Sequence, residues 1–142
     1  MPRMQQLQKN LPDCLCALYS TTLSDSLVAS SLICTLPPGS LVVNATGLGK
    51  DGPGSPITDA APFPERGFAW DFNYRGDLVF LEQARRQETA KRLHIEDGWL
   101  YFIHGWLAVI ADVFHHDIPA SGPVFEDLAR IAGCERRPES CE

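Results

Sequence analysis

The residues best suited to do chemistry begin with a glycine-rich run that directly follows an apolar segment. Gly47-Leu-Gly49-Lys-Asp-Gly52 has the Gly-x-Gly-x-x-Gly spacing with which a turn can hold the pyrophosphate of a dinucleotide. That binding mode needs a helix directly after the turn, because the phosphates lie against the free amides of its first residues. Residues 53–56 are Pro-Gly-Ser-Pro and cannot begin a long helix. We therefore interpret the run as a glycine-rich loop beside a ligand.

Two further groups of residues are candidates for a binding site. Asp71 and Tyr74 come just after a predicted strand, at the end where open α/β sheets bind their ligands. His104 and Gly105 interrupt an otherwise apolar helical stretch. A lone histidine in such a place is more often a satisfied core residue than a ligand. A glycine inside a helix often marks the close approach of a backbone or a ligand.

The cysteines and histidines do not indicate a metal site. The five cysteines include no Cys-x-x-Cys pair, and Cys14 and Cys16 are closer together than the ligands of zinc sites usually are. His115 and His116 are adjacent, so on a helix their side chains point about 100° apart. We expect reduced thiols and no structural metal.

Composition and charge limit the partners and the compartment. The chain of 142 residues suits one domain, and its net charge of −6 argues against binding to nucleic acid or to an anionic membrane surface. The longest apolar stretch, residues 99–111, spans about thirteen residues, whereas crossing a bilayer takes about twenty. The polar start of the chain has no features of a secretory signal. We therefore expect a cytoplasmic protein that does not enter membranes.

The order of the predicted elements indicates the α/β class with a mostly parallel sheet. We expect a helical remnant at residues 4–9, a short strand at 14–19, and a helix at 24–33 capped by Ser24 or Asp25. The continuous, β-branched run at residues 40–46 predicts a strand covered by helices on both faces. A long loop covers residues 47–67, and loops of this length are usually functional or disordered. Residues 67–72 form a second predicted strand.

The C-terminal half of the chain is predicted to be largely helical. One helix is expected from the cap Asp77 to Arg92, with the ion pairs Glu82–Arg86 and Glu88–Arg92 on its outer side. Asp97 starts a second helix over residues 99–114, which is apolar nearly all round and needs burial against a sheet or a partner subunit. A last helix ends at Gly133.

Three segments, in this order, resemble the second half of the cofactor domain of the shikimate/quinate dehydrogenase family. Residues 41–49, LVVNATGLG, are similar to the family's V-x-N-A-T-x-x-G strand and turn. Residues 69–74, AWDFNY, are similar to its D-x-x-Y segment, and residues 95–103, IEDGWLYFI, to its D-G-x-x-M-L stretch. The resemblance covers roughly residues 40–115. It implies a partial Rossmann-like domain over residues 40–133, preceded by a poorly defined remnant (1–39) and followed by a polar tail (134–142).

The resemblance implies a role for several residues. The family reduces 3-dehydroshikimate to shikimate with NADP, reversibly, in the biosynthesis of aromatic amino acids. NADP is therefore the implied cofactor, with NAD as the alternative, and a small cyclic hydroxy acid is the implied substrate. The residues implied to contact the nicotinamide end of the cofactor are Asn44, Ala45, Thr46, Gly47, Phe72 (through its backbone) and Gly98. Those implied to contact the substrate are Tyr74, Tyr101 and His104.

The sequence also departs from the family. The family's glutamine on the helix of the last motif is replaced here by Gly105, beside His104. The family's methionine in the same motif is replaced by Tyr101. The N-x-T-x-P-x-K and N-T-D motifs that carry the catalytic lysine and aspartate are absent, as are the phosphate-binding glycine loop and the basic residue that selects NADP. We therefore expect a fragment of such an oxidoreductase that is inactive alone. We assign no catalytic residue in this chain.

Two alternatives to this interpretation stay open. Residues 44–50 also fit N-x-T-x-x-x-K, which would make Lys50 the catalytic base, although Leu48 replaces the proline and the downstream segments do not agree with that register. The second alternative is a non-catalytic chain that completes or regulates a partner, or forms a homodimer. It would do so through the apolar helix that carries Trp99, Tyr101, Phe102 and Trp106.

Overall fold

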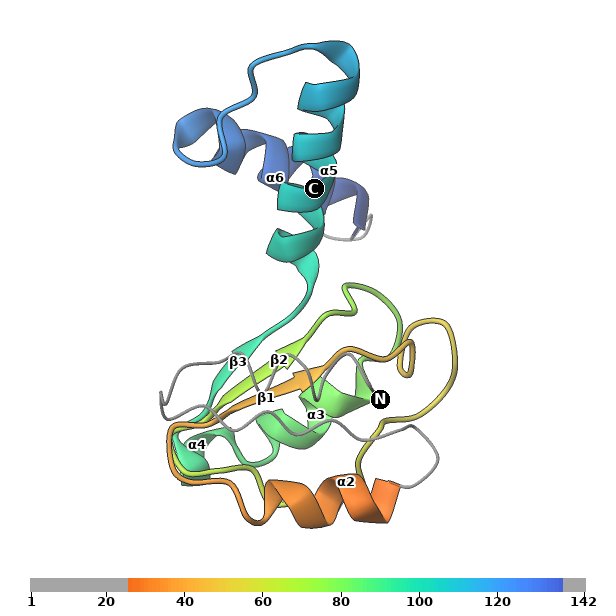
Figure 1. Ribbon diagram of the computed structural model, residues 1–142, viewed down its shortest axis with the longest axis vertical. Coiled ribbons are helices and arrows are strands. Elements are labelled where there is room, and N and C mark those ends of the chain that lie inside the picture. The colour runs from red at the N-terminus through yellow and green to blue at the C-terminus, as the bar shows by residue number, and fades with distance from the viewer. Residues whose placement is uncertain (1–25, 137–142) are drawn as a thin grey trace, which may run out of the picture.

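The computed structural model describes residues 26–136, with side chains described to residue 133. The expected helix at 4–9, the expected strand at 14–19 and the caps Ser24 and Asp25 lie outside the described residues. The described elements are α2 (Ser26–Ile33), β1 (Leu41–Asn44), β2 (Phe68–Asp71), α3 (Val79–Arg85), α4 (Glu88–Lys91), β3 (His94–Glu96), α5 (Trp99–Phe114) and α6 (Pro123–Arg136) (Figure 1).

The three strands form one parallel sheet in the order β1-β2-β3. Leu41 is paired with Phe68 and Asn44 with Asp71, while Phe68 is also paired with His94. The sheet is open and flanked by helices, so the expected α/β class is confirmed, in the arrangement of a partial Rossmann-like fold. The third strand was not expected, because a three-residue strand with one apolar residue has too little pattern to be recognised.

The expected strand over residues 40–46 is shorter in the structure and ends at Asn44. The reason is local, since the Asn44 side chain turns back on the chain that follows it. Its Oδ1 accepts hydrogen bonds from the Thr46 amide at 3.0 Å and from Thr46 Oγ1 at 2.7 Å. These bonds form a turn that stops the strand.

One face of the sheet carries the main hydrophobic core. Ala69 of the central strand packs with Phe80, Leu81 and Ala84 of α3, and α2 adds Ala29 and Ile33. Figure 1 shows α2, α3 and α4 on the same side of the sheet. On the opposite face, Leu41 is 55% and Phe68 46% exposed within the described part of the chain. The expectation of helices on both faces is therefore wrong for residues 26–136.

The long loop between β1 and β2 belongs to the core. Ile57, Ala61 and Phe63 are buried. Two glutamines hold the loop from the helical side: Gln83 Nε2 donates to the Ile57 carbonyl at 3.3 Å and to Asp59 Oδ1 at 2.9 Å, and Gln87 Nε2 donates to the Ala61 carbonyl at 2.9 Å. The middle part of the loop is therefore fixed by hydrogen bonds to α3 and to Gln87, and its apolar side chains pack in the main hydrophobic core.

The single helix expected over residues 77–92 is two short helices, α3 and α4. The residue before α3 is Leu78, in a left-handed conformation with φ of 47°, so the expected cap Asp77 is wrong. The helix breaks at Gln87, whose Oε1 also accepts from the Phe63 amide at 3.1 Å. The expected pairs Glu82–Arg86 and Glu88–Arg92 are not among the ion pairs of the described residues: Glu82 pairs with Arg85, and Arg86 pairs with Asp59 at 3.4 Å.

The two last helices pack on each other and extend away from the sheet (Figure 1). The α5 helix has the predicted bounds, and the Asp97 carboxylate accepts the Trp99 amide at 2.8 Å at its start. The α6 helix continues through Gly133 to Arg136, so the expected end at Gly133 is wrong. Gly133 remains helical and faces the Trp99 indole, 3.8 Å from the position a Cβ would take.

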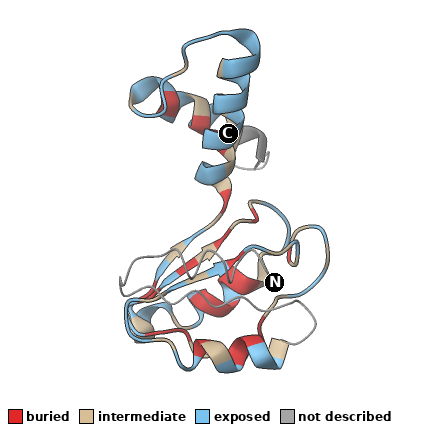
Figure 2. Ribbon diagram, in the orientation of Figure 1, coloured by how far each residue is buried: buried red, intermediate tan, exposed pale blue. Residues whose placement is uncertain are grey.

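The α5 helix is far less buried than its apolar sequence predicts. Ile103 is its one buried residue, packed with Phe125 and Ala129 of α6. Figure 2 shows most of the helix as exposed. The expected burial against a sheet is therefore wrong for the described residues, because α5 leaves the sheet after its first turn. No helix in residues 26–136 has the length and apolar character needed to cross a bilayer.

Candidate functional site

Three loops meet where the parallel strands end. Thr46 follows β1, Phe72 and Tyr74 follow β2, and Gly98 follows β3. Because Asn44 is paired with Asp71, and Trp70 with Glu96, the three strands end at the same edge of the sheet. The Phe72 amide donates to the Asn44 carbonyl at 3.0 Å, and the Gly98 amide to the Asn73 carbonyl at 3.0 Å. The three segments are therefore held side by side by their own backbones.

A buried polar network lies beneath these loops. Asn44, Asp71 and Asn73 are each at most 3% exposed. Asn44 Nδ2 donates to Asp71 Oδ2 at 3.1 Å, and the Asn73 amide donates to Asp71 Oδ1 at 2.9 Å. Asn73 Nδ2 donates to the Leu48 carbonyl at 2.9 Å and so attaches the glycine-rich turn to the same network.

The network surrounds an ionisable group, the carboxyl of Asp71. Burial raises the pKa of Asp71, although the hydrogen bonds from the Asn73 amide, from the Asn44 side chain and from the Asn73 side chain work in the opposite direction. The nearby carboxylate of Asp97 adds a smaller upward effect on the same pKa. Sequence reasoning noted Asp71 but missed its partners. The available signal was that Asn44 and Asp71 both lie near the carboxyl ends of the two predicted strands, residues 40–46 and 67–72.

The structure separates the supporting residues of the first motif from the accessible ones. Asn44 is buried and its side chain is used by Thr46 and Asp71, so it shapes the turn from within. Thr46 Oγ1 also accepts the Leu48 amide at 3.2 Å and is half-buried. Ala45 and Gly47 are exposed at the sheet edge. A ligand can therefore reach Ala45 and Gly47 directly, and Thr46 through the part of its side chain that is not buried.

Gly98 has a packing reason for being glycine. A Cβ at this position would lie 2.1 Å from the Phe72 carbonyl oxygen, so no other residue fits without moving the backbone. This contact brings together Gly98 and the backbone of Phe72, both of which the resemblance implies to contact the nicotinamide end of the cofactor. Gly105, in contrast, has nothing within 4 Å of its missing Cβ outside its own helix, so the expected close approach at Gly105 is wrong for the described residues.

Aromatic stacking connects the strand ends to the first turn of α5. The Tyr74 ring stacks on Phe102 with 4.0 Å between centroids, and Phe72 stacks on Tyr101 at 5.0 Å. Two of the three residues expected to contact substrate, Tyr74 and Tyr101, therefore lie beside the loops of the site. His104 does not join them, since its ring stacks on Phe125 of α6 at 4.2 Å. The residue is exposed, so the core position expected for it is wrong, and its contact with a substrate stays a prediction.

The glycine-rich turn is closed on itself. The amides of Lys50, Asp51 and Gly52 all donate to the Gly47 carbonyl, at 3.2, 2.8 and 3.2 Å, and are therefore used internally. No helix follows the turn before α3, in agreement with the interpretation that this is not a dinucleotide fingerprint. The turn is pressed against the loop after β2, since a Cβ at Gly76 would lie 2.2 Å from the Gly49 carbonyl oxygen.

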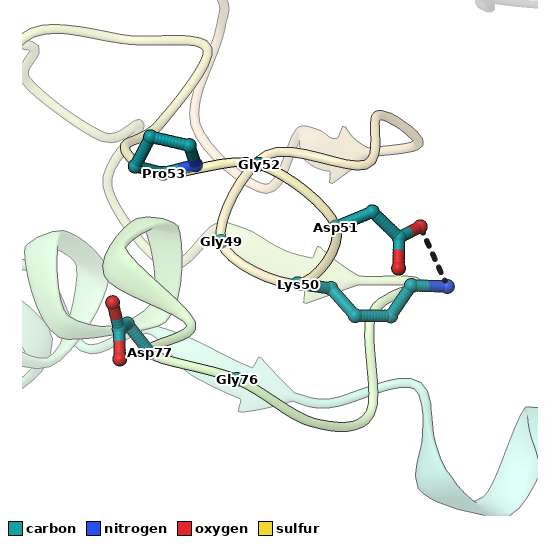
Figure 3. A pocket seen from close by; sticks show the side chains of 7 residues that line it. All are labelled: Gly49, Lys50, Asp51, Gly52, Pro53, Gly76 and Asp77. Carbon is teal, nitrogen blue, oxygen red and sulfur yellow. Dashed lines mark ion pairs between the residues drawn. The ribbon is translucent and has the colours of Figure 1, made fainter.

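A shallow hollow opens between these two loops (Figure 3). Its volume is about 270 Å³, and it is lined by Gly49, Lys50, Asp51, Gly52, Pro53, Gly76 and Asp77. Lys50 Nζ lies 3.3 Å from Asp51 Oδ2 on one side of the hollow, and Asp77 points away from that pair on the other side. Among the described residues, no group of three or more histidine, cysteine, aspartate or glutamate side chains could hold a metal ion.

The chain has no significant match among protein-family models, curated proteins or solved structures.

The chemistry of the site follows from its geometry. The sheet edge offers exposed backbone at Ala45 and Gly47, a half-buried tyrosine and a cation at the entrance to the hollow. Such a surface can bind and orient a planar or anionic ligand. Its buried carboxyl, Asp71, is enclosed by amides and supports the loops from below.

Proposed function

We propose that this chain forms the nicotinamide-side wall of the cofactor site in an oxidoreductase similar to shikimate dehydrogenase. In this proposal the cofactor is NADP, and the substrate is a small cyclic hydroxy acid that lies between the nicotinamide ring and Tyr74. The exposed residues Ala45 and Gly47 and the half-buried Phe72 border the ring, and Gly98 is buried behind Phe72.

The observation that supports the proposal most is the meeting of three separate motif segments at one edge of a parallel sheet. Open α/β sheets bind ligands at the carboxyl ends of their strands. The Phe72–Gly98 contact and the buried Asn44–Asp71 hydrogen bond hold the three segments in a fixed arrangement. A preformed wall of this kind suits a cofactor whose ring must be oriented for hydride transfer.

The proposal assigns orientation to this chain and leaves proton transfer to other residues. Hydride transfer to a carbonyl needs a proton donor within hydrogen-bond reach. The lysine and aspartate motifs that provide the donor in the resembling family do not occur in the sequence. In the closed glycine turn, the amides of residues 49–52 donate to carbonyl groups of the turn itself and are not offered to a pyrophosphate. The chain as it stands is therefore expected to hold the nicotinamide half of the cofactor weakly and to be inactive alone.

Titration with the two halves of the cofactor tests this proposal. Amide chemical shifts of the ¹⁵N-labelled chain are followed while nicotinamide mononucleotide or adenosine 2′,5′-bisphosphate is added. The nicotinamide half is expected to shift the amides of residues 45–47, 72 and 98, and the adenosine half to leave them unchanged. Tight binding of the adenosine half, or shifts confined to other parts of the chain, would contradict the proposal.

A second candidate function is supported by the exposed surface of α5. Trp106 is 54% and Phe114 64% exposed, with Val109 and Val113 on the same helix also more than half exposed. Contiguous apolar surface of this kind is typical of protein–protein interfaces. In this case the chain completes or regulates a partner through α5, and concentration-dependent association without binding of either cofactor half would favour this function over the first.

A further inference from the structure

Two cations from different loops approach the same carboxylate beside the candidate site. Lys50, in the turn after β1, lies 3.3 Å from Asp51 Oδ2. Arg75, in the loop after β2, lies 3.8 Å from the other oxygen, Asp51 Oδ1. Each oxygen of the carboxylate therefore faces one positive charge, as a bound anion would require.

The same two cations also share one aromatic ring. Lys50 Nζ lies 5.5 Å and the Arg75 guanidinium carbon 5.7 Å from the centre of the Tyr74 ring. Such contacts restrain the positions of cations near an aromatic face. Lys50 is only 22% exposed in its side chain, so its ammonium group is held beside the ring and partly shielded from water. The Arg75 side chain is 63% exposed, so Lys50 is the more firmly held of the two cations that face the Tyr74 ring.

Asp51 itself is held less firmly. Its side chain is 60% exposed and lies on the glycine-rich turn at the side of the hollow (Figure 3). An exposed ion pair contributes little to stability, about 0–1 kcal/mol, so exchanging this carboxylate for another anion costs little. The hollow beside it has space for the body of a small ligand.

We propose that Lys50 and Arg75 form an anion-binding subsite, and that Asp51 occupies it when no ligand is bound. The ligand group is a carboxylate or a phosphate attached to a small molecule that contacts Tyr74. It displaces Asp51 and takes over the two cations. Assigning that group to the substrate's carboxylate rests on the proposed function, whereas the binding of an anion at this place does not.

Variants of the internal carboxylate and of the cations test the subsite. Binding of cyclohexanecarboxylate and of inorganic phosphate is measured separately, at low salt and without any nicotinamide compound, through the amide shifts of Gly49 and Gly76. Asp51→Asn is expected to tighten binding at least about fivefold, since it removes the competing charge. Lys50→Gln and Arg75→Gln are expected to weaken binding at least about fivefold, and Lys50→Arg to restore it.

A matched control separates the subsite from a general change of charge. Asp59 forms a similarly exposed pair with Arg86 at 3.4 Å, so Asp59→Asn removes the same charge at another place. It is expected to leave both affinities unchanged. Equal tightening by Asp51→Asn and Asp59→Asn, or shifts that do not involve Gly49 and Gly76, would overturn the proposal, as would an absence of binding in Asp51→Asn.

The two probes also distinguish the source of the ligand group. Tighter binding of the carboxylate assigns the subsite to a substrate acid, and tighter binding of phosphate assigns it to a cofactor phosphate. Either result supports the anion subsite. Because no nicotinamide compound is present, these results are independent of the titration with the cofactor halves, and each proposal can fail without the other.

Discussion

Asn44 and Asp71, the last residues of two neighbouring parallel strands, are joined by a buried hydrogen bond of 3.1 Å between Nδ2 and Oδ2. The bond fixes the relative position of the two loops that carry Thr46 and Tyr74. It also places a carboxyl group where water is excluded, since Asp71 has no exposed surface. The arrangement of the candidate site therefore depends on a polar pair that no ligand reaches.

The raised pKa of Asp71 predicts how stability depends on pH. A carboxyl group with a higher pKa in the folded than in the unfolded state binds more protons when folded, so its contribution to stability falls as the pH rises through these two values. Wild type should therefore lose stability, relative to Asp71→Asn, as the pH increases from the ordinary aspartate pKa to that of the folded protein.

Two measurements check this prediction. The Asp71 carboxyl carbon is followed by NMR during a pH titration, and the free energy of unfolding of both variants is measured by urea denaturation across the same range. A folded-state pKa below the usual aspartate value, or parallel stability curves, would contradict the account of burial as the dominant effect.

Replacing Asn44 by alanine should destabilise the fold. The substitution removes the acceptor of the Thr46 amide and hydroxyl and one donor to the buried Asp71. Leaving such groups without partners costs about 2–3 kcal/mol in the free energy of unfolding. Ser31→Ala is the control, because Ser31 makes an exposed bond to the Val28 carbonyl, and its effect should stay within about 0.5 kcal/mol. Similar losses in both variants would argue against the buried network.

Two glycine-to-alanine changes should have opposite effects. Gly98→Ala places a Cβ 2.1 Å from the Phe72 carbonyl oxygen and should lower the free energy of unfolding by about 2–3 kcal/mol. Gly105→Ala meets nothing within 4 Å and lies inside α5, so it should raise that free energy by about 0.5–1 kcal/mol. Urea denaturation measures both, and a neutral Gly98→Ala would show that the strand ends are not packed together as described.

The exposed face of α5 predicts self-association or partner binding that depends on Trp106 and Val113. The double substitution Trp106→Ser and Val113→Ser should reduce any concentration-dependent increase in sedimentation coefficient, because it removes apolar surface. Val124→Ser, at a residue exposed to a similar extent on α6, is the matched control and should leave sedimentation unchanged. Equal effects of the two changes would mean that α5 is not a specific interface.

Strong local patterns allowed much of the fold to be predicted. The β-branched run before Asn44 and the long apolar stretch from Trp99 to Phe114 both lie where they were expected. The break at Gln87 was not predictable, because it depends on hydrogen bonds to Ala61 and Phe63, more than twenty residues earlier in the chain. The strand His94–Glu96 is too short to show any periodicity.

The candidate site was predictable at the level of segments and not of side chains. A parallel sheet brings the residues after its strands to one edge, so the two predicted strands indicate that Thr46 and Tyr74 lie close together. The position of Gly98 beside them depends on β3, which was not predicted. Which side chain supports a turn and which faces outward depends on tertiary contacts. Hence Asn44 proved to be internal, and His104 turned towards α6 because it packs on Phe125.

The most direct test of the nicotinamide wall is a set of intermolecular nuclear Overhauser effects from bound nicotinamide mononucleotide. The account predicts transfer from the nicotinamide ring protons to the Ala45 and Thr46 methyl groups and to the Tyr74 ring. Transfer instead to α6, or to Leu41 and Phe68 on the open face of the sheet, would contradict it.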